Sequence, residues 1–399
     1  MSFLPLLTLL TRLVRFPRFL FALTAAFALG SCMHEPSPTG LDLLPGEDLV
    51  GVERFDSRAT DPEIRTSSWF VPANGATSQF LYLGKTEEYT GRIAIRWIGF
   101  PGSIAEAGRI VSASVTLYAT PYKFGDTLTP LVFEAREILS PWSSYTLTSD
   151  SISAMRLGSV PAGSFNGFVR DSVEFTLDTA VVRSWLVKMA ALRYGEIYGV
   201  LLEPKSPSAA VYAFEAQEAF NRKPVFRIVM SLDGVNDTTF YASSLEDTFV
   251  AEGPKFSTAS LTVHGGLSWR GGIRFDLSAV PRGSIVNAAA LTFTVDPARR
   301  RDNIRGIDSL WVYARLDTVQ NTLGSERTLT RTADSGRFVA EGLVITRMVQ
   351  RWVNHPETNN GFALVKLEEG SDLDGIGFYD AAAPAWLKPR LVITYTLKP

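Results

Sequence analysis

The sequence predicts an all-β protein built from two tandem antiparallel β-sandwich domains, each with one short helix. Three observations support this fold class: short runs in which apolar and polar residues alternate, frequent turn residues between those runs, and a repeat of motifs along the chain. Of the 399 residues, 46% are hydrophobic and 20% are charged, which excludes a wholly disordered chain. The 31 Gly, 22 Pro and 11% aromatic residues favour strands joined by turns over a helical bundle.

The amino terminus, residues 1–31, has the features of a secretory signal peptide. Arg12, Arg15 and Arg18 precede the apolar run Phe19–Leu29, which is shorter than the roughly 20 residues that a membrane-spanning helix needs. The run ends in the residues Leu29–Cys32, which resemble the lipobox of bacterial lipoproteins.

That resemblance implies that Cys32 becomes the lipid-modified first residue of the mature chain. An ordinary signal peptide with a chance cysteine remains the alternative. Residues 32–48 are rich in Pro, Gly and acidic residues and are expected to form a flexible tether. We therefore expect a membrane partner through the lipid at Cys32. The expected location is the bacterial outer membrane or cell surface, because Met33 is not the acidic residue that often retains lipoproteins at an inner membrane.

The remainder of the chain repeats itself. Phe214–Ile228 aligns without a gap with Tyr379–Ile393, and upstream motifs match in the same order in both halves. The sequence thus predicts a first repeat at 49–232, a linker at 233–237 with turn-forming residues, and a second repeat at 238–399.

Each repeat contains several runs with a period of two. One face of each predicted strand is apolar and the other is polar, as expected for strands that are buried on one side only. The predicted core-facing sets are Ile93/Ile95/Trp97, Ala113/Val115/Leu117, Val173/Phe175/Leu177, Phe226/Ile228/Met230, Leu291/Phe293/Val295 and Leu391/Ile393/Tyr395. The set at Leu291 is one residue out of phase with the preceding Ile285 motif, so a β-bulge is expected there.

One helix is predicted in each repeat. In the first repeat Asp178 is a plausible N-cap, and Val181, Trp185 and Met189 follow a helical spacing. In the second repeat Ile345, Met348, Val349 and Trp352 form the same stripe, and Pro356 is expected to end it. We expect Trp185 and Trp352 to be core residues that close one end of each sandwich.

The order of these motifs resembles the DNRLRE-domain family, which consists of jelly-roll modules often classed with carbohydrate-binding modules. The second repeat carries the motifs Ile273–Ser278, Val280–Ile285, Gly361–Leu364 and Lys388–Leu391. The first repeat carries shorter forms of them and has Ile98 where the second has Asp276. The resemblance implies a jelly-roll fold and a polysaccharide ligand.

A search of the sequence for catalytic motifs is negative. The chain has three histidines, His34, His264 and His355, and none accompanies a serine or cysteine in a known nucleophile motif. We therefore predict no catalysis. A pair of carboxylates acting as a glycoside hydrolase or lyase remains a third alternative, because sequence gives no distance between acids.

The densest acidic stretch, residues 368–375, suggests a weak Ca²⁺ site. Glu368, Glu369, Asp372 and Asp374 would supply oxygen ligands, although the spacing does not match a complete EF-hand loop. The alternative is a solvated loop between strands. No other cofactor is expected.

A sugar-binding site would need exposed aromatic rings beside polar side chains. Trp142, which follows Ser140 and Pro141, and the nearby Tyr145 are the preferred candidates because they lie in a loop-like segment. Packing within the fold remains the alternative for both. The other candidates are Trp69, Trp269, Trp311 and Trp386, of which Trp69 and Trp311 lie in runs that suit a core strand equally well.

The charge balance, 39 basic against 41 acidic residues, excludes a nucleic-acid partner that binds through a broad basic face. The function expected from the sequence is non-catalytic polysaccharide binding at the cell surface. A structural or adhesive envelope protein that contacts other proteins is the main alternative.

Overall fold

The computed structural model describes residues 51–71, 75–100, 104, 108–232, 234–301, 309–333, 336–367, 369 and 373–397. The predicted signal peptide, the tether and Cys32 lie outside these residues. Apart from Val52, the described strands and helices belong to one compact unit, Glu53–Lys398.

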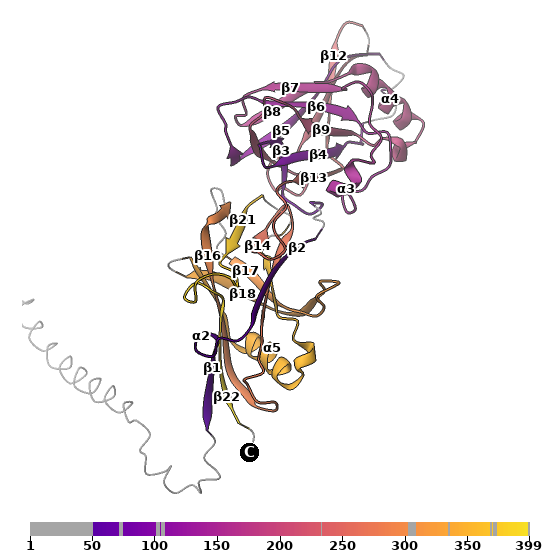
Figure 1. The fold of residues 1–399 in the computed structure, drawn as a ribbon. Coiled ribbons are helices and arrows are strands. Elements are labelled where there is room, and N and C mark those ends of the chain that lie inside the picture. Colours follow the sequence, from indigo (N-terminus) through magenta and orange to yellow (C-terminus); the bar gives the residue numbers. More distant parts are fainter. Residues whose placement is uncertain are drawn as a thin grey trace, which may run out of the picture. The chain divides into compact units, whose positions relative to one another are not determined.

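The first sheet contains eleven strands (Figure 1). They are β3 (Phe80–Lys85), β4 (Thr90–Arg96), β5 (Arg109–Gly125), β6 (Leu131–Glu137), β7 (Gly163–Gly167), β8 (Ser172–Leu177), β9 (Val200–Pro204), β10 (Ala210–Glu215), β11 (Val225–Ser231), β12 (Asp237–Ser243) and β13 (Glu246–Glu252). A pairing between β5 and β10 closes eight of these strands, β3–β10, into a ring. We call this sheet, residues 80–252, barrel one.

The second sheet also contains eleven strands and has the same topology. They are β1 (Val52–Asp56), β2 (Ile64–Phe70), β14 (Leu261–His264), β15 (Trp269–Phe275), β16 (Ile285–Arg301), β17 (Ser309–Arg315), β18 (Leu323–Ala333), β19 (Arg337–Glu341), β20 (Phe362–Lys366), β21 (Gly375–Phe378) and β22 (Arg390–Thr396). A pairing between β16 and β21 closes its ring. We call this sheet, residues 52–70 and 261–396, barrel two. The predicted fold class, two closed antiparallel β-domains with few short helices, is confirmed.

The alternating runs are buried as the sequence predicts. Every residue of the six predicted core-facing sets is buried in one of the two main apolar clusters. The predicted bulge is also present, because the register of β16 against β22 shifts between Val286 and Ala288. The equivalent pair in barrel one, β5 and β11, shifts between Val229 and Met230.

The two predicted helices are α4 (Thr179–Ala190) and α5 (Leu343–Asn354). Asp178 caps α4 by accepting a hydrogen bond of 2.6 Å from the Ala180 N–H. Trp185 and Trp352 are both buried, which confirms that each is a core residue. The remaining short elements are α2 (Ser57–Thr60), α3 (Ser149–Ile152) and the 3-10 turns η4 (Tyr194–Glu196) and η5 (Pro356–Thr358).

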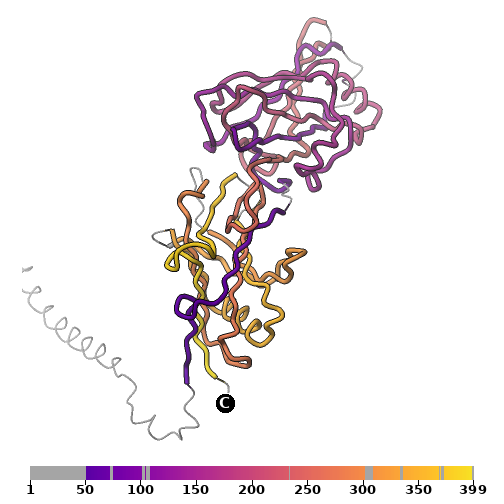
Figure 2. The backbone as a smooth tube through the Cα atoms, viewed as in Figure 1, coloured from indigo at the N-terminus to yellow at the C-terminus, as the bar shows by residue number. Residues whose placement is uncertain are grey.

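The division of the strands between the two sheets differs from the division of the sequence into two repeats. Strand β2 pairs antiparallel with β15 over seven residue pairs, and β1 lies beside β22, so the first strands of the chain belong to barrel two. Strands β12 and β13 pair with β11 and β4 and so belong to barrel one. Figure 2 shows the indigo segment that holds β1 and β2 among the orange and yellow strands of the second sheet.

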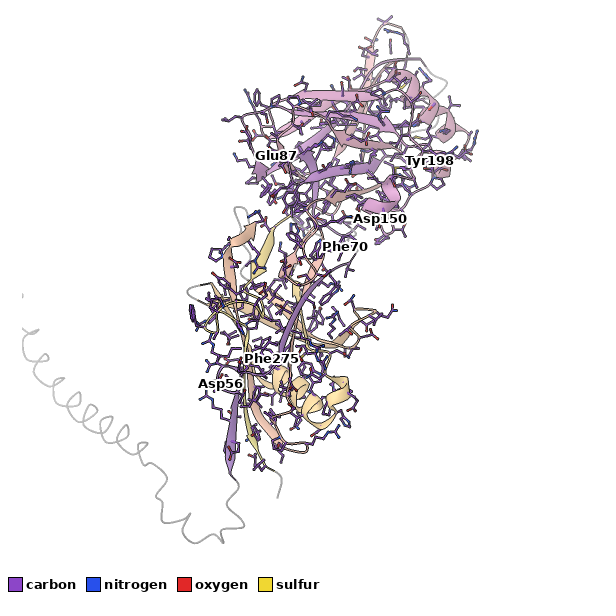
Figure 3. All side chains as sticks on the ribbon, viewed as in Figure 1. Asp56, Phe70, Glu87, Asp150, Tyr198 and Phe275 are labelled. Carbon is purple, nitrogen blue, oxygen red and sulfur yellow. The ribbon has the colours of Figure 1, made fainter. Side chains whose placement is uncertain are left out.

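Two side-chain contacts fasten β1 to barrel two. Arg390 donates to both carboxylate oxygens of Asp56, which is labelled on this segment in Figure 3, and Ser57 Oγ accepts a hydrogen bond of 2.9 Å from the Leu391 N–H. The hydrogen bonds from Arg390 lower the pKa of Asp56 to about 2. Barrel two therefore combines two strands from the start of the described chain, β1 and β2, with the nine strands β14–β22 from its second half.

Barrel one, in contrast, is continuous in sequence and is inserted between β2 and β14 of barrel two. The segment predicted as a linker between domains joins β11 to β12 within barrel one, where Ser231 pairs with Asp237. The predicted limits 49–232 and 238–399 describe the repeat in the sequence, whereas the sheets follow the pairing of β12, β13, β1 and β2. The two-residue periodicity of the sequence could not reveal this difference, because it identifies which face of a strand is buried but not which strands pair with it.

This exchange of strands predicts how fragments of the chain behave. A fragment of residues 75–256 should unfold cooperatively on heating, because it contains every strand of barrel one. A fragment of residues 49–232 should not, because β4 and β11 lose the partners β13 and β12. Circular dichroism and amide-proton NMR spectra of the two fragments test this expectation. Cooperative folding of residues 49–232 together with disorder of residues 75–256 would contradict the strand assignment.

Candidate functional site

The structure separates the two residues that the sequence favoured for sugar binding. The Trp142 ring is half-buried on a small apolar cluster of barrel one, and its Nε1 donates a hydrogen bond of 2.8 Å to the Tyr198 carbonyl. The Tyr145 side chain is 72% exposed. Trp142 thus has a packing role, and only Tyr145 offers an open ring.

The residues proposed as calcium ligands have other partners where the structure describes them. Arg270 binds Glu369 in a bidentate ion pair with distances of 2.6 to 3.2 Å. Asp374 is buried and accepts a hydrogen bond of 3.2 Å from the Tyr122 hydroxyl. Glu368 and Asp372 lie outside the described residues, and within the described part no group of three or more His, Cys, Asp or Glu is placed to hold a metal ion.

His264 is fully buried and is not available as a base. The Leu267 N–H lies 3.4 Å from its Nδ1, and its Nε2 lies 3.1 Å from the Tyr89 hydroxyl, so the hydrogen-bond network assigns the ring proton to Nε2. Burial lowers the pKa of His264 to about 3, with a smaller effect from the positive charge of Lys366. This imidazole is therefore neutral at pH 7.

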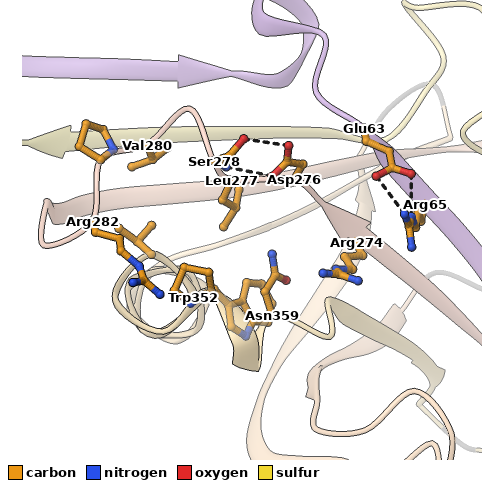
Figure 4. Close-up of a pocket in the computed structure, with 13 residues that line it drawn as sticks. Glu63, Arg65, Arg274, Asp276, Leu277, Ser278, Val280, Arg282, Trp352 and Asn359 are labelled. Carbon is orange, nitrogen blue, oxygen red and sulfur yellow. Dashed lines mark hydrogen bonds and ion pairs between the residues drawn. The ribbon is translucent and has the colours of Figure 1, made fainter.

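A cavity of about 390 Å³ opens in barrel two where β15 ends and α5 meets η5 (Figure 4). Its walls combine apolar side chains with guanidinium, carboxylate and amide groups. The lining residues are Glu63, Arg65, Arg274, Asp276, Leu277, Ser278, Val280, Pro281, Arg282, Trp352, Val353, Pro356 and Asn359. We call this cavity the α5 pocket.

Asn359 is the most deeply buried polar residue that lines the α5 pocket. Its Nδ2 donates a hydrogen bond of 2.9 Å to the Phe275 carbonyl, which fixes the orientation of the amide. Its Oδ1 is buried and has no hydrogen-bond partner. A buried acceptor without a partner costs about 1–3 kcal/mol, so a bound hydroxyl or amine would be stabilised there.

The charged residues of the α5 pocket differ in their partners. Arg65 donates to both carboxylate oxygens of Glu63 at 2.7 and 3.1 Å, and Asp276 accepts from the backbone and hydroxyl of Ser278 at 3.0 and 2.8 Å. Arg274 makes no hydrogen bond or ion pair with the other described residues. The pocket thus offers one free guanidinium, two carboxylates and one unsatisfied amide oxygen.

The same positions in barrel one carry apolar side chains. Asp276 follows Phe275 at the end of β15, and Ile98 follows Trp97 at the end of β4. Asn359 follows η5, and Ile197 follows η4, where it is fully buried. The carboxylate of Asp276 and the amide of Asn359 are therefore specific to barrel two. The sequence alone indicated part of this difference, because the first repeat has Ile98 where the second repeat has Asp276.

A second unusual polar group lies on the exchanged strand β13 of barrel one. Asp247 is buried, its carboxylate accepts from the Gln217 N–H at 3.0 and 3.3 Å, and burial raises its pKa to about 7. Ser244 Oγ lies 2.9 Å from both Asp247 Oδ2 and Gln217 Oε1, yet a serine has only one hydroxyl proton to donate. A protonated Asp247 would supply the second proton by donating to Ser244.

This geometry predicts a pH-dependent stability. The raised pKa means that the unfolded chain loses its proton near pH 4 and the native state near pH 7, so the free energy of unfolding falls between these values and is level above them. Asp247→Asn mimics the protonated acid. It should match the wild type near pH 4 and exceed it by about 4 kcal/mol at pH 8, at about 1.4 kcal/mol for each pKa unit.

Urea denaturation at pH 4 to 8 measures this difference. The exposed Asp237→Asn is the matched control and should leave the pH profile unchanged. Parallel pH profiles for the wild type and Asp247→Asn would show that folding does not raise the pKa of Asp247.

The fold and the pocket define an all-β protein of two related barrels with a polar cavity in one of them. No family model matches the chain, and no curated protein sequence matches it. Among solved structures, one titled BspA_C_mut has 11% identity, a TM-score of 0.14, and coverage of 84% of this chain and 90% of its own. The C-terminal domain of the Streptococcus agalactiae AgI/II polypeptide BspA has 12% identity, a TM-score of 0.15, and coverage of 84% and 92%. Scores this low carry no argument about function.

Within the described part of the chain, no helix is both long and apolar enough to cross a membrane.

Proposed function

We propose that the protein is a non-catalytic polysaccharide-binding protein and that the α5 pocket of barrel two holds the sugar. The observation that carries this proposal is the buried, unpartnered Oδ1 of Asn359 in a cavity that also presents Arg274 and Asp276. Planar side chains with fixed hydrogen-bonding groups suit the adjacent hydroxyls of a sugar ring.

The shape and lining of the pocket agree with this proposal. Its volume of about 390 Å³ lies within the range of small-molecule sites, and its apolar residues, among them Trp352 and Val353, would contact the C–H faces of a sugar. Asp276 and Arg274 stand at the end of one strand, so a ligand could receive hydrogen bonds from one and donate to the other.

The cellular setting is part of the same proposal. A lipid on Cys32 would hold the chain at the bacterial outer membrane or cell surface, where polysaccharides are abundant. The resemblance of the motifs to the DNRLRE-domain family also supports a glycan ligand. A single acyl chain anchors a protein to a membrane only marginally, whereas two or more acyl chains anchor it stably.

An adhesive role that uses protein contacts is the second candidate, and a pair of exposed aromatic residues favours it. Phe220, between β10 and β11, is 97% exposed, and Trp386, between β21 and β22, is 68% exposed. These two connections are equivalent in the two barrels. Each barrel therefore exposes an aromatic ring in this connection, and these rings are where contacts with another protein would form.

A glycan array followed by calorimetry on the best ligand tests the proposed site. Asn359→Leu removes the buried acceptor and Asp276→Asn removes a charge, and each should weaken binding about tenfold or more, the effect of losing about 1.4 kcal/mol. Tyr145→Ala, which removes an exposed ring of barrel one, is the matched control and should bind like the wild type. Loss of binding in Tyr145→Ala alone would move the site to barrel one, and silence across neutral and acidic glycans would reject the proposed function.

A further inference from the structure

A second cavity of barrel two, of about 320 Å³, lies on the face formed by β2, β15 and the end of β17. Nine described residues line it, and none of them is acidic. They are Arg65, Thr66, Ser67, Gly272, Ile273, Arg274, Arg315, Thr318 and Asn360. We call this cavity the arginine pocket. It shares Arg65 and Arg274 with the α5 pocket.

Arg315 is a buried cation with no carboxylate within ion-pair distance in the described residues, although the charge of Asp317, two residues further on, acts on it. Its side chain is held by neutral groups: Nη1 donates to Ser67 Oγ at 3.3 Å, Nη2 donates to the Thr318 carbonyl at 3.1 Å, and Nη2 also donates to Asn321 Oδ1. Its guanidinium lies 4.2 Å from the ring centre of Trp69. The Nε is buried and unpartnered, and burial lowers the pKa of this arginine.

The strand pairing adds a second uncompensated charge. Arg65 on β2 lies directly opposite Arg274 on β15, and like charges in directly opposed positions destabilise a sheet. Glu63 neutralises Arg65 through its bidentate contact. Arg274 has no bidentate partner of this kind among the described residues, although the charge of Glu63 also acts on it. Arg274 and Arg315 therefore bring to one cavity two guanidinium groups that no carboxylate of the described residues engages by a hydrogen bond or an ion pair.

The equivalent positions of barrel one carry a different set of charges. Arg96 on β4 corresponds to Arg274 and lies opposite Glu246, with which it forms an ion pair of 2.5 Å. Ile138 corresponds to Arg315, because its N–H donates to the Gly199 carbonyl at 2.9 Å as that of Arg315 donates to Gly361. Barrel one therefore has an ion pair and an apolar residue where barrel two has two arginines without a carboxylate at ion-pair distance in the described residues.

The covering of this face also differs between the barrels. In barrel one the connection from β6 to β7, residues 138–162, packs Trp142, Met155 and Leu157 onto the small cluster that contains Ile138. In barrel two the connection from β17 to β18 is only residues 316–322. The arginine pocket is open because this covering segment is short.

From this arrangement we infer that the arginine pocket is a binding site for a doubly charged tetrahedral oxyanion, either sulfate or phosphate, free or as an ester. Guanidinium groups bind such oxyanions through paired N–H donors, and no carboxylate of the described residues accepts a hydrogen bond from Arg274 or Arg315. Ser67 Oγ already accepts from Arg315 and can donate its own proton to the anion. Gly272 keeps the space open, since a Cβ there would lie 2.7 Å from Ser67 Oγ and 3.2 Å from Arg315 Nη1.

Calorimetric titration of the full chain with inorganic sulfate and with inorganic phosphate, each at constant ionic strength against chloride, tests the inference. Both should bind and raise the melting temperature. Arg274→Ala, an exposed residue whose loss should not impair folding, should bind each anion at least about tenfold more weakly. Arg96→Ala in barrel one is the matched control and should bind like the wild type.

Absence of any anion effect on the wild type, or equal binding by Arg274→Ala and Arg96→Ala, would overturn the inference. Arg315→Met removes the buried cation and should abolish binding, and if this variant fails to fold, the comparison of Arg274 with Arg96 decides. Competition by glucose 6-sulfate but not by glucose would assign the anion to an ester on a sugar, and binding of the inorganic ion alone would assign it to a free ion. Because the probe is inorganic, these results do not depend on whether any polysaccharide binds the α5 pocket.

Discussion

The pairing of β2 with β15 is the contact on which the organisation of barrel two depends. Strand β2 comes from residues 64–70 and β15 from residues 269–275, so a complete barrel one separates them in the sequence. Their alignment fills one side of β15 with hydrogen bonds and places Arg65 beside Arg274. The counterpart in barrel one, β13 with β4, is closed within a continuous segment. The ring of barrel two closes within residues 261–378, but the addition of β1 and β2 to it requires the two ends of the described chain to meet, and this step carries the larger loop entropy.

This connection makes the two pockets products of long-range structure. The α5 pocket takes Glu63 and Arg65 from the start of the described chain and Asn359 from near its end. The arginine pocket combines β2 and β15 with the end of β17. Each contains residues that are more than two hundred positions apart, so neither could be recognised as a local motif.

The sequence predicted the features that depend on local patterns. Period two identified the buried faces, as at Val173, Phe175 and Leu177, and the helical stripe identified Trp185 and Trp352 as core residues. Strand partners and side-chain neighbours do not follow from such patterns, because every edge with free N–H and C=O groups can accept any extended strand. Arg315 ends the apolar run of β17, and no pattern in the neighbouring sequence marks it as a buried cation beside Trp69.

The differences between the barrels on this face depend on one another. An arginine at the position of Ile138, beneath the cover formed by residues 138–162, would be a buried charge sealed from water, which costs several kcal/mol. An isoleucine at the position of Arg315, beneath the short connection of barrel two, would leave an apolar patch open to solvent. The short connection and the cation therefore suit each other, as do the long connection and the apolar cluster. The length of the connection and the residue beneath it therefore decide together whether this face is a packed apolar cluster or a charged cavity.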